Sequence, residues 1–287
     1  MSKTWFISGA SSGLGREMAE KLLARGDRVV AAIRRPDGVA DLQARHGEQA
    51  LAVRLDLMDA ASIRAAVDEA VRRCGRIDVV VSNAGYGLFG AAEEVSDAQI
   101  ERQIATNLTG SIQLVRAALP HLRRQGGGRI VQVSSEGGQI AYPNFSLYHA
   151  TKWGIEGFIE SVAQEVAPFG IDFIIAEPGP TGTGFGAALD HAPPMEAYEQ
   201  TPAGEVRRAI GTSAFPIKGD AERTVQAIVA AADSPRPAFR LTLGSTAYDS
   251  ISAALRGRLD ALLAQRAVAF SADRTGDAVQ AEQEGQG

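Results

Sequence analysis

Short apolar runs alternate with helical patterns along most of this chain, and this alternation constrains the fold more than any other feature. The runs are rich in Val and Ile and nearly continuous in apolar residues, which is typical of strands buried on both faces of a parallel sheet. Strand, helix and strand repeated in this order imply right-handed crossovers. The sequence therefore predicts an α/β fold with a doubly wound parallel sheet. The predicted strands span residues 4–8, 28–33, 50–55, 78–82, 128–135, 172–177 and 239–244.

The chain reads as a single domain over residues 1–270. No linker rich in Pro, Gly or Ser divides the first 180 residues, but residues 180–216 break the pattern with many Gly and Pro. We expect this stretch to form a lid or binding loop, with a plain surface excursion as the alternative. A helix is predicted near residues 247–269. The tail, residues 271–287, has no large apolar residue other than Val279 and is expected to be disordered.

Composition excludes several classes of function. A net charge of -5 with scattered arginines argues against a nucleic-acid surface. Cys74 is the only cysteine, which fits a reducing compartment, so we expect a cytoplasmic protein. The four histidines, His46, His121, His149 and His191, lack metal-ligand spacing, so no metal site is predicted. No apolar run approaches the roughly 20 residues that a membrane span needs, and the N-terminus reaches Gly and Ser too soon for a signal peptide.

The first predicted strand runs into a glycine-rich turn, GASSGLG, and then into a helix. Gly9, Gly13 and Gly15 would let backbone amides approach a phosphate, and the helix N-terminus adds partial positive charge. The spacing Gly-x-x-x-Gly-x-Gly differs from the commonest dinucleotide fingerprint, Gly-x-Gly-x-x-Gly. We interpret the turn as a dinucleotide site, with a tight turn that binds nothing as the alternative.

Two arginines follow the second predicted strand, where an acidic residue would bind the ribose of NAD. Arg34 and Arg35 instead favour the 2′-phosphate of NADP, unless they are simply solvated surface arginines. Arg34 follows the strand directly and is the better candidate. Asp56 is predicted either to meet the adenine or to cap a loop. The segment SNAG (82–85) ends the fourth strand, beside the first, where strand order reverses and ligands bind; a simple turn is its alternative.

The segment YHATK places Tyr148 and Lys152 on one face of a helix. A free phenol has a pKa near 10, and a nearby ammonium would lower the pKa of Tyr148 toward a range useful for proton transfer. Lys also presents a compact charge that can bind ribose hydroxyls. A buried Tyr beside a Lys with its charge at the surface is the alternative. Two further polar features accompany the pair: Ser134 and Ser135 end the fifth strand, and Asn107 sits inside a helical pattern where Asn is unfavourable.

Taken together, these segments resemble the short-chain dehydrogenase/reductase family. The matching text includes SGASSGLG, LDL, SNAGYG, TNLTG, GRIVQVSS, YHATK and EPGPTGT, in the expected order over about 175 residues. Small departures are Ser8, where Thr is usual, and Ser82, where Asn is common. The resemblance implies a Rossmann-like sheet of seven strands and a catalytic tetrad of Asn107, Ser135, Tyr148 and Lys152. It also implies these cofactor contacts: Gly9, Ser11, Ser12, Gly13, Leu14, Gly15, Arg34, Asp56, Leu57, Asn83, Ala84, Gly85, Tyr148, Lys152, Pro178, Gly179 and Thr183.

The resulting hypothesis is an NADP(H)-dependent oxidoreductase that transfers hydride between nicotinamide and a carbonyl or secondary alcohol. The segments EPGPTGTGF and PFGI look most like the hydroxysteroid and retinol dehydrogenase branch. Tyr148 would move the proton, Ser135 would hold the substrate oxygen, Lys152 would fix the ribose, and Asn107 would place a relaying water. The alternatives are a catalytically silent NADP-binding regulator and a sugar-nucleotide epimerase or dehydratase.

A small hydrophobic substrate is expected, because several apolar side chains could line the pocket. They could equally pack the lid against the core. The resemblance also implies a homodimer or homotetramer formed through the Tyr-bearing helix, and Ile155, Phe158 and Ile159 are predicted on its outer face. The candidate pocket residues are Phe145, Tyr86, Leu88, Phe185, Met195 and Tyr198.

Overall fold

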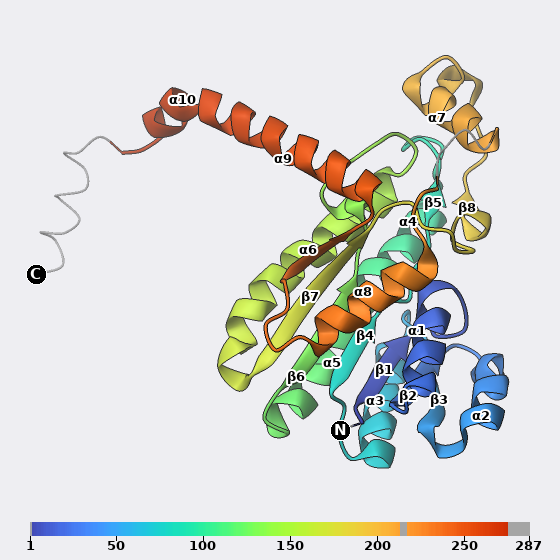
Figure 1. The fold of residues 1–287 in the computed structure, drawn as a ribbon. Helices are drawn as coiled ribbons and strands as arrows, with labels where there is room; N and C mark the ends of the chain where they lie inside the picture. The colour runs from blue at the N-terminus through green and yellow to red at the C-terminus, as the bar shows by residue number, and fades with distance from the viewer. Residues whose placement is uncertain (1, 213–216, 275–287) are drawn as a thin grey trace, which may run out of the picture.

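A single parallel sheet of seven strands forms the centre of the protein (Figure 1). The computed structural model describes residues 2–212 and 217–274. The strand order is β3-β2-β1-β4-β6-β7-β9. β4 lies beside β1, and the order in which successive strands are added reverses between these two strands, as predicted. The doubly wound, Rossmann-like sheet is thus confirmed. Its strands are β1 (Thr4–Ser8), β2 (Arg28–Ile33), β3 (Ala50–Arg54), β4 (Val79–Ser82), β6 (Gly128–Val133), β7 (Ile171–Pro178) and β9 (Arg240–Leu243).

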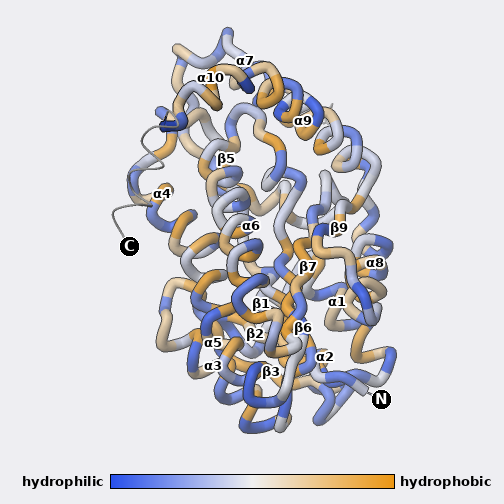
Figure 2. The backbone as a smooth tube through the Cα atoms, turned by 90° about the vertical axis from the view of Figure 1, so that its left-hand side faces the viewer, coloured by the Kyte–Doolittle hydropathy of each residue, from blue (hydrophilic) through white to orange (hydrophobic). Residues whose placement is uncertain are grey.

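Helices cover both faces of this sheet, which explains why its strands are apolar throughout. On β1, Trp5 and Ile7 join the core under α1 and α8, while Phe6 joins the core under α3, α5 and α6. Figure 2 shows the hydrophobic strands enclosed between the helices. The helices are α1 (Gly13–Ala24), α2 (Ala40–His46), α3 (Ala60–Cys74), α4 (Asp97–Ile104), α5 (Gly110–Arg124), α6 (Ser146–Val166), α7 (Pro202–Gly211), α8 (Ala221–Asp233), α9 (Ser245–Ala264) and α10 (Arg266–Ser271).

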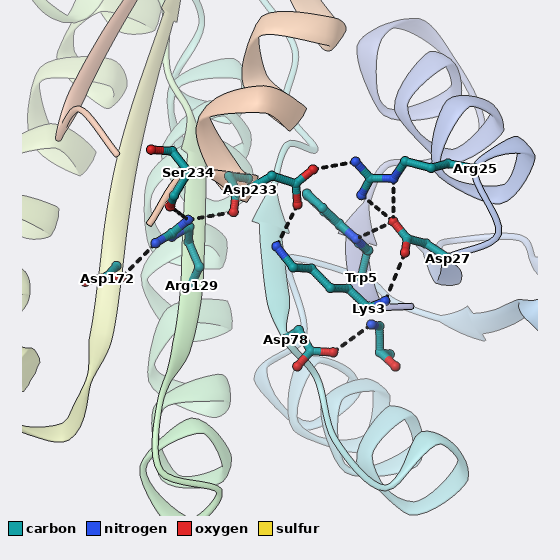
Figure 3. Close-up of polar contacts among 11 residues, drawn as sticks. Lys3, Trp5, Arg25, Asp27, Asp78, Arg129, Asp172, Asp233 and Ser234 are labelled. Carbon is teal, nitrogen blue, oxygen red and sulfur yellow. Dashed lines mark hydrogen bonds and ion pairs between the residues drawn. The ribbon is translucent and has the colours of Figure 1, made fainter. Parts of the chain in front are cut away.

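The amino end of the sheet is closed by a network of paired charges (Figure 3). The buried carboxylate of Asp27 accepts hydrogen bonds from the Lys3 amide at 2.9 Å, Trp5 Nε1 at 3.2 Å and Arg25 Nε at 2.9 Å. Asp233, the last residue of α8, pairs with Lys3 and Arg25. These contacts join α1, α8 and the first strand, so they stabilise the doubly wound arrangement far from the carboxyl ends of the strands.

Residues 180–212 contain more regular structure than the predicted loop. Two residues of this segment form β8 (Asp190–His191), which pairs in parallel with β5 (Leu88–Phe89), and α7 follows. Their contacts are made across the fold, so the sequence pattern does not reveal them. Residues 213–216, which the sequence assigns to the same segment, lie outside the described residues.

The predicted C-terminal helix is present but divided. α9 ends at Ala264, and a break at Gln265 separates it from α10. Of the tail that the sequence predicts to be disordered, residues 275–287 lie outside the described residues. None of the helices in the described ranges combines the length and the apolarity that a membrane crossing requires.

The prediction for the outer face of α6 is partly wrong. Ile155 and Ile159 are fully buried in the core of their own chain, and only Phe158 is partly exposed. The apolar pattern of this helix therefore reflects packing against the sheet and α5 rather than an outer surface.

Candidate active site

The turn between β1 and α1 brings three glycines together under tight steric limits. Gly9 has a φ of +74° and Gly13 a φ of +55°, in the left-handed region that favours glycine. A Cβ on Gly15 would stand 2.4 Å from the Gly9 carbonyl oxygen. The first turn of α1 carries no acidic residue, and Ser12 makes no side-chain capping bond. The turn therefore fits the phosphates of a dinucleotide, which its amides and the helix N-terminus would hold.

Asn83, just after β4, ties this turn to the neighbouring strand. Its Nδ2 donates to the carbonyl oxygens of Ser8 at 3.0 Å and Gly9 at 3.4 Å. The Ser8 hydroxyl in turn accepts from the amides of Asn83 at 2.9 Å and Ala84 at 3.1 Å. Asn83 thus holds the backbone of the glycine turn (residues 9–15, called the glycine cradle below) in place. The Ser8 hydroxyl accepts the hydrogen bonds of the two amides that follow β4.

Arg34 directly follows β2 and is exposed. Within residues 2–212 and 217–274, neither Arg34 nor Arg35 has a partner for its side chain in a hydrogen bond or ion pair. The segment that follows them lies against the glycine turn, because a Cβ on Gly38 would stand 3.5 Å from Ser11 Cβ. Arg34 and Arg35 therefore stand, exposed, between the end of β2 and a segment that packs against the glycine turn.

Asp56 makes a loop contact of the kind that the sequence offered as its alternative, and its contact with adenine stays a prediction. Asp56 lies two residues beyond the end of β3, and its Oδ1 accepts a hydrogen bond from the Met58 amide at 3.0 Å. The other residues predicted to bind the cofactor follow the carboxyl ends of strands: Ser11, Ser12 and Leu14 after β1, Leu57 after β3, Ala84 and Gly85 after β4, and Pro178, Gly179 and Thr183 at and after the end of β7.

Asn107 lies where the long helix from α4 to α5 widens into a π turn, Ala105–Thr109. Its Oδ1 accepts from the Tyr86 amide at 3.1 Å, and its Nδ2 donates to the Tyr86 carbonyl at 2.8 Å. The buried amide of Asn107 therefore fixes the chain after β4, next to Gly85. This contact and the π turn explain why an Asn, which has poor helix propensity, occupies a position inside the helix. π turns are often found at functional sites.

The two adjacent serines after β6 have different surroundings. The Ser134 hydroxyl donates to the buried carboxylate of Glu156. The Ser135 hydroxyl accepts from the Gly137 amide at 3.1 Å and interacts with the phenol of Tyr148. Ser135, rather than Ser134, is thus the serine beside the tyrosine, as the sequence predicted.

Tyr148 and Lys152 are both buried on α6, with the lysine Nζ 5.5 Å from the centre of the tyrosine ring. Burial raises the pKa of Tyr148 to about 12; Ser135 opposes this rise, and the carboxylates of Glu136 and Glu156 add to it. Burial also lowers the pKa of Lys152 to about 8, which Glu156 opposes. The sequence predicted that Lys152 lowers the pKa of Tyr148. In the structure burial is the largest influence on this phenol, and it acts in the other direction.

A buried charge network behind this pair was not predicted. Glu156 lies one turn beyond Lys152, and its Oε2 accepts from Gln139 Nε2 at 2.6 Å and Arg240 Nη1 at 2.7 Å. Arg240, on β9, also binds the buried Glu177. A Cβ on Gly138 would stand 1.8 Å from Glu156 Oε1, so any larger residue there would have to displace this carboxylate. The spacing of Tyr148, Lys152 and Glu156 along α6 was the available signal.

The segment predicted as a lid lies over the tyrosine. The Phe185 ring is 5.7 Å from that of Tyr148, and the Phe145 ring is 6.1 Å away. Phe89, Phe145 and Tyr148 form an apolar cluster that receives partly buried side chains from the lid, Leu189, Val206 and Ile210, together with Tyr142.

The lid is held by a buried carboxylate. Glu94 accepts hydrogen bonds from the Met195 amide at 2.8 Å and from Arg207 Nη2 at 2.6 Å. Among the other predicted pocket residues, Leu88 packs in a neighbouring cluster, and Tyr198 donates its hydroxyl to Glu93 at 2.8 Å. Leu88 and Tyr198 thus hold the lid and its surroundings in place.

Comparison with known proteins agrees with this geometry. The family model described as short chain dehydrogenase matches residues 3–193. The curated oxidoreductase BOA17 of Botryotinia fuckeliana is 35% identical over 250 residues, covering 87% of this chain and 91% of that protein. A solved short-chain dehydrogenase from Streptomyces avermitilis is 36% identical, with a TM-score of 0.87 over 95% of this chain and 98% of that one.

Two further solved structures were determined with nicotinamide cofactors. A 3-ketoacyl-(acyl-carrier-protein) reductase from Brucella melitensis, complexed with NADH, is 26% identical with a TM-score of 0.70, covering 84% of this chain and 96% of that one. An alcohol dehydrogenase from the archaeon Thermococcus sibiricus, complexed with 5-hydroxy-NADP, is 25% identical with a TM-score of 0.69, covering 85% and 96%. Structural neighbours thus bind either form of the nucleotide.

Proposed function

The chain belongs to the short-chain dehydrogenase family and is an oxidoreductase of that type, and we propose that it reduces a hydrophobic carbonyl compound, or oxidises the corresponding alcohol, with NADP(H). One observation carries the proposal: Ser135, Tyr148 and Lys152 are buried together at the carboxyl end of the sheet. The glycine cradle lies at the same end, where open α/β sheets bind their ligands.

The chain's own groups account for proton transfer and orientation. Tyr148, with its pKa raised by burial, stays protonated at neutral pH and donates its proton to the carbonyl oxygen during reduction. Ser135 hydrogen-bonds that oxygen, and Lys152 holds the ribose and supplies positive charge beside the resulting phenolate. When bound, the nicotinamide cofactor supplies or accepts the hydride. Asn107 holds the Tyr86 backbone and is the candidate for ordering a water that returns protons through Lys152.

The proposal of NADP over NAD rests on Arg34. Arg34 is exposed directly after β2, ahead of the segment that packs against the glycine turn, and no other described side chain binds it, so it is available to a 2′-phosphate. Arg35 offers a matched control. We expect NADPH to bind more tightly than NADH. Arg34→Ala should weaken NADPH binding roughly 10- to 100-fold, which corresponds to the loss of a charged hydrogen bond, and should change NADH binding little. Arg35→Ala should change the affinity for either nucleotide little. Titration calorimetry measures each affinity. Equal binding of both nucleotides by the wild type would contradict the NADP assignment.

The substrate class follows from the lining of the site. Phe89, Phe145 and Phe185 surround Tyr148 with apolar surface, and the lid adds aliphatic side chains. Such a pocket favours a hydrophobic ketone, aldehyde or alcohol, in keeping with the suspected likeness to the hydroxysteroid and retinol dehydrogenase branch. A cytoplasmic location and a homodimeric or homotetrameric assembly stay predictions.

The reaction is tested by following NADPH oxidation with a panel of aromatic aldehydes and ketones. Reduction of at least one, with saturation at micromolar to millimolar concentration, is the expected result. Folded protein that binds NADPH but reduces none would favour the alternative, a catalytically silent NADP-binding regulator. The presence of all four tetrad side chains argues against that alternative.

A further inference from the structure

α9 leaves the body of the protein as a long helix with an apolar exposed side. Figure 1 shows α9 and α10 extending away from the sheet and the other helices. Half of the exposed large hydrophobic side chains in the described residues lie on these two helices, and each is at least 49% exposed. Such a surface usually marks an interaction site. The side chains are Tyr248, Leu255, Leu259, Leu262, Leu263, Val268 and Phe270.

Only the part of α9 up to Arg258 is attached to the body. Ile251 is buried, the Ser250 hydroxyl donates to Glu136 Oε2 at 2.9 Å, and the guanidinium of Arg258 lies 5.0 Å from the centre of the Trp153 ring. Within the described part of the chain, the hydrogen bonds and ring contacts of α9 and α10 side chains beyond Arg258 stay inside these two helices. Among the described residues, nothing outside α9 and α10 covers the leucines that follow Arg258.

The spacing of the exposed side chains fits a partner helix. Tyr248, Leu255 and Leu262 recur every seven residues, and Leu259 follows Leu255 by four. Residues at these intervals form a single stripe along a helix, the arrangement that packs against another helix by knobs into holes. We call these four residues the α9 stripe.

We propose that the α9 stripe pairs with the α9 stripe of a second copy of this chain, antiparallel and about a two-fold axis near Leu259. An isologous contact must be self-complementary, and this stripe is. The axis sets Leu255 against Leu262 of the partner subunit, with Leu259 beside the axis. Each body then lies at the opposite end of the helix pair, so the two bodies do not compete for the same space.

Charge supports the same arrangement. Arg256 and Asp260 are both exposed on one flank of the stripe, at equal distances on either side of residue 258. An antiparallel partner therefore brings Arg256 against Asp260 of the partner subunit, twice by symmetry. An anionic membrane fits less well, because the chain carries a net charge of -5 and the exposed arginines of α9 are matched by Asp249 and Asp260.

A cysteine placed near the axis tests the geometry. In a Cys74→Ser background, the single cysteine of Leu259→Cys should form a disulfide-linked dimer on mild oxidation, seen on a non-reducing gel. Gly257→Cys is the matched control: Gly257 is equally exposed, with nothing within 4 Å of an added Cβ, but it points away from the stripe. Cross-linking at residue 259 and not at residue 257 supports the proposal. Cross-linking equally at both positions, or at neither, overturns it.

Charge reversal provides a second test in the full chain. Arg256→Asp should raise the dissociation constant of the dimer at least tenfold in sedimentation velocity, and combining it with Asp260→Arg should restore most of the loss. Failure of the double variant to recover would overturn the antiparallel pairing. Binding of the wild type to phosphatidylcholine vesicles containing phosphatidylglycerol, without cross-linking at residue 259, would assign the stripe to a membrane surface instead.

Discussion

The two ends of the central sheet differ in how many hydrogen-bond partners they give to a buried charged group. At the amino end, the carboxylate of Asp27 is surrounded by donors from Lys3, Trp5 and Arg25 (Figure 3). At the carboxyl end, Lys152 Nζ has one hydrogen bond, to the Val133 carbonyl at 3.0 Å, and burial moves its pKa well below the usual value.

This difference separates stability from function. A buried charge with a full set of partners favours the folded state once it is in place, whereas a buried charge with few partners lowers stability and is available to a ligand. The amino end therefore holds the first strand to α1 and α8. The carboxyl end keeps Tyr148 and Lys152 in protonation states that respond to a bound molecule.

The largest effect on stability is expected at the amino end. Asp27→Ala would leave Trp5 Nε1 and the Lys3 amide without their shared acceptor, and each donor left unpaired in this way costs about 1–3 kcal/mol of unfolding free energy. Asp172→Ala is the control, because this carboxylate is half exposed and its pairing with Arg129 should contribute under about 1 kcal/mol. Urea unfolding measures both. Similar losses in the two variants would remove the distinction between the sites.

The opposite sign is expected for Lys152→Met. The folded-state pKa of about 8 lies below the unfolded 10.5, so at pH 7 the buried ammonium costs about 3 kcal/mol. The variant also loses the hydrogen bond to Val133, which lowers its stability by about 1 kcal/mol. The unfolding free energy should therefore rise by about 2 kcal/mol in total. The gain should shrink as pH rises from 8 to 10.5. Lys218→Met, at an exposed position, should change nothing. A less stable Lys152→Met protein at pH 7 would contradict this account.

The smallest effect is a shift in pH dependence. Glu156 raises the pKa values of both Lys152 and Tyr148, so Glu156→Gln should lower both. Carbonyl reduction needs both groups protonated, and its decline at high pH should therefore move to lower pH, by less than about one unit. Glu160→Gln is matched, because Glu160 binds the same Arg240 at 2.7 Å but is half exposed. Equal pH profiles in all three proteins would exclude an influence of Glu156.

Features written in local sequence could be predicted, whereas those that depend on distant contacts could not. The seven strands follow from apolar runs, and the glycine turn, Tyr148 and Lys152 follow from short spacings. Arg240 reaches Glu156 across 84 residues, so no local pattern indicated their pairing. The π turn around Asn107 and the β5–β8 pair likewise depend on tertiary contacts. The pKa of Tyr148 was mispredicted because charge can be read from neighbouring residues, while the depth of burial cannot.

The most direct test of the central claim is the Tyr148→Phe variant, measured for both NADPH binding and turnover of a carbonyl compound that the wild type reduces. The phenyl ring keeps the packing against Phe145 and Phe185 and removes only the proton donor. We predict NADPH affinity within about threefold of wild type and a loss of turnover of about 10³-fold or more, near the upper end of what a positioned acid contributes. Substantial turnover by Tyr148→Phe would show that the proton comes from elsewhere and would contradict the assignment of this end of the sheet as the active site.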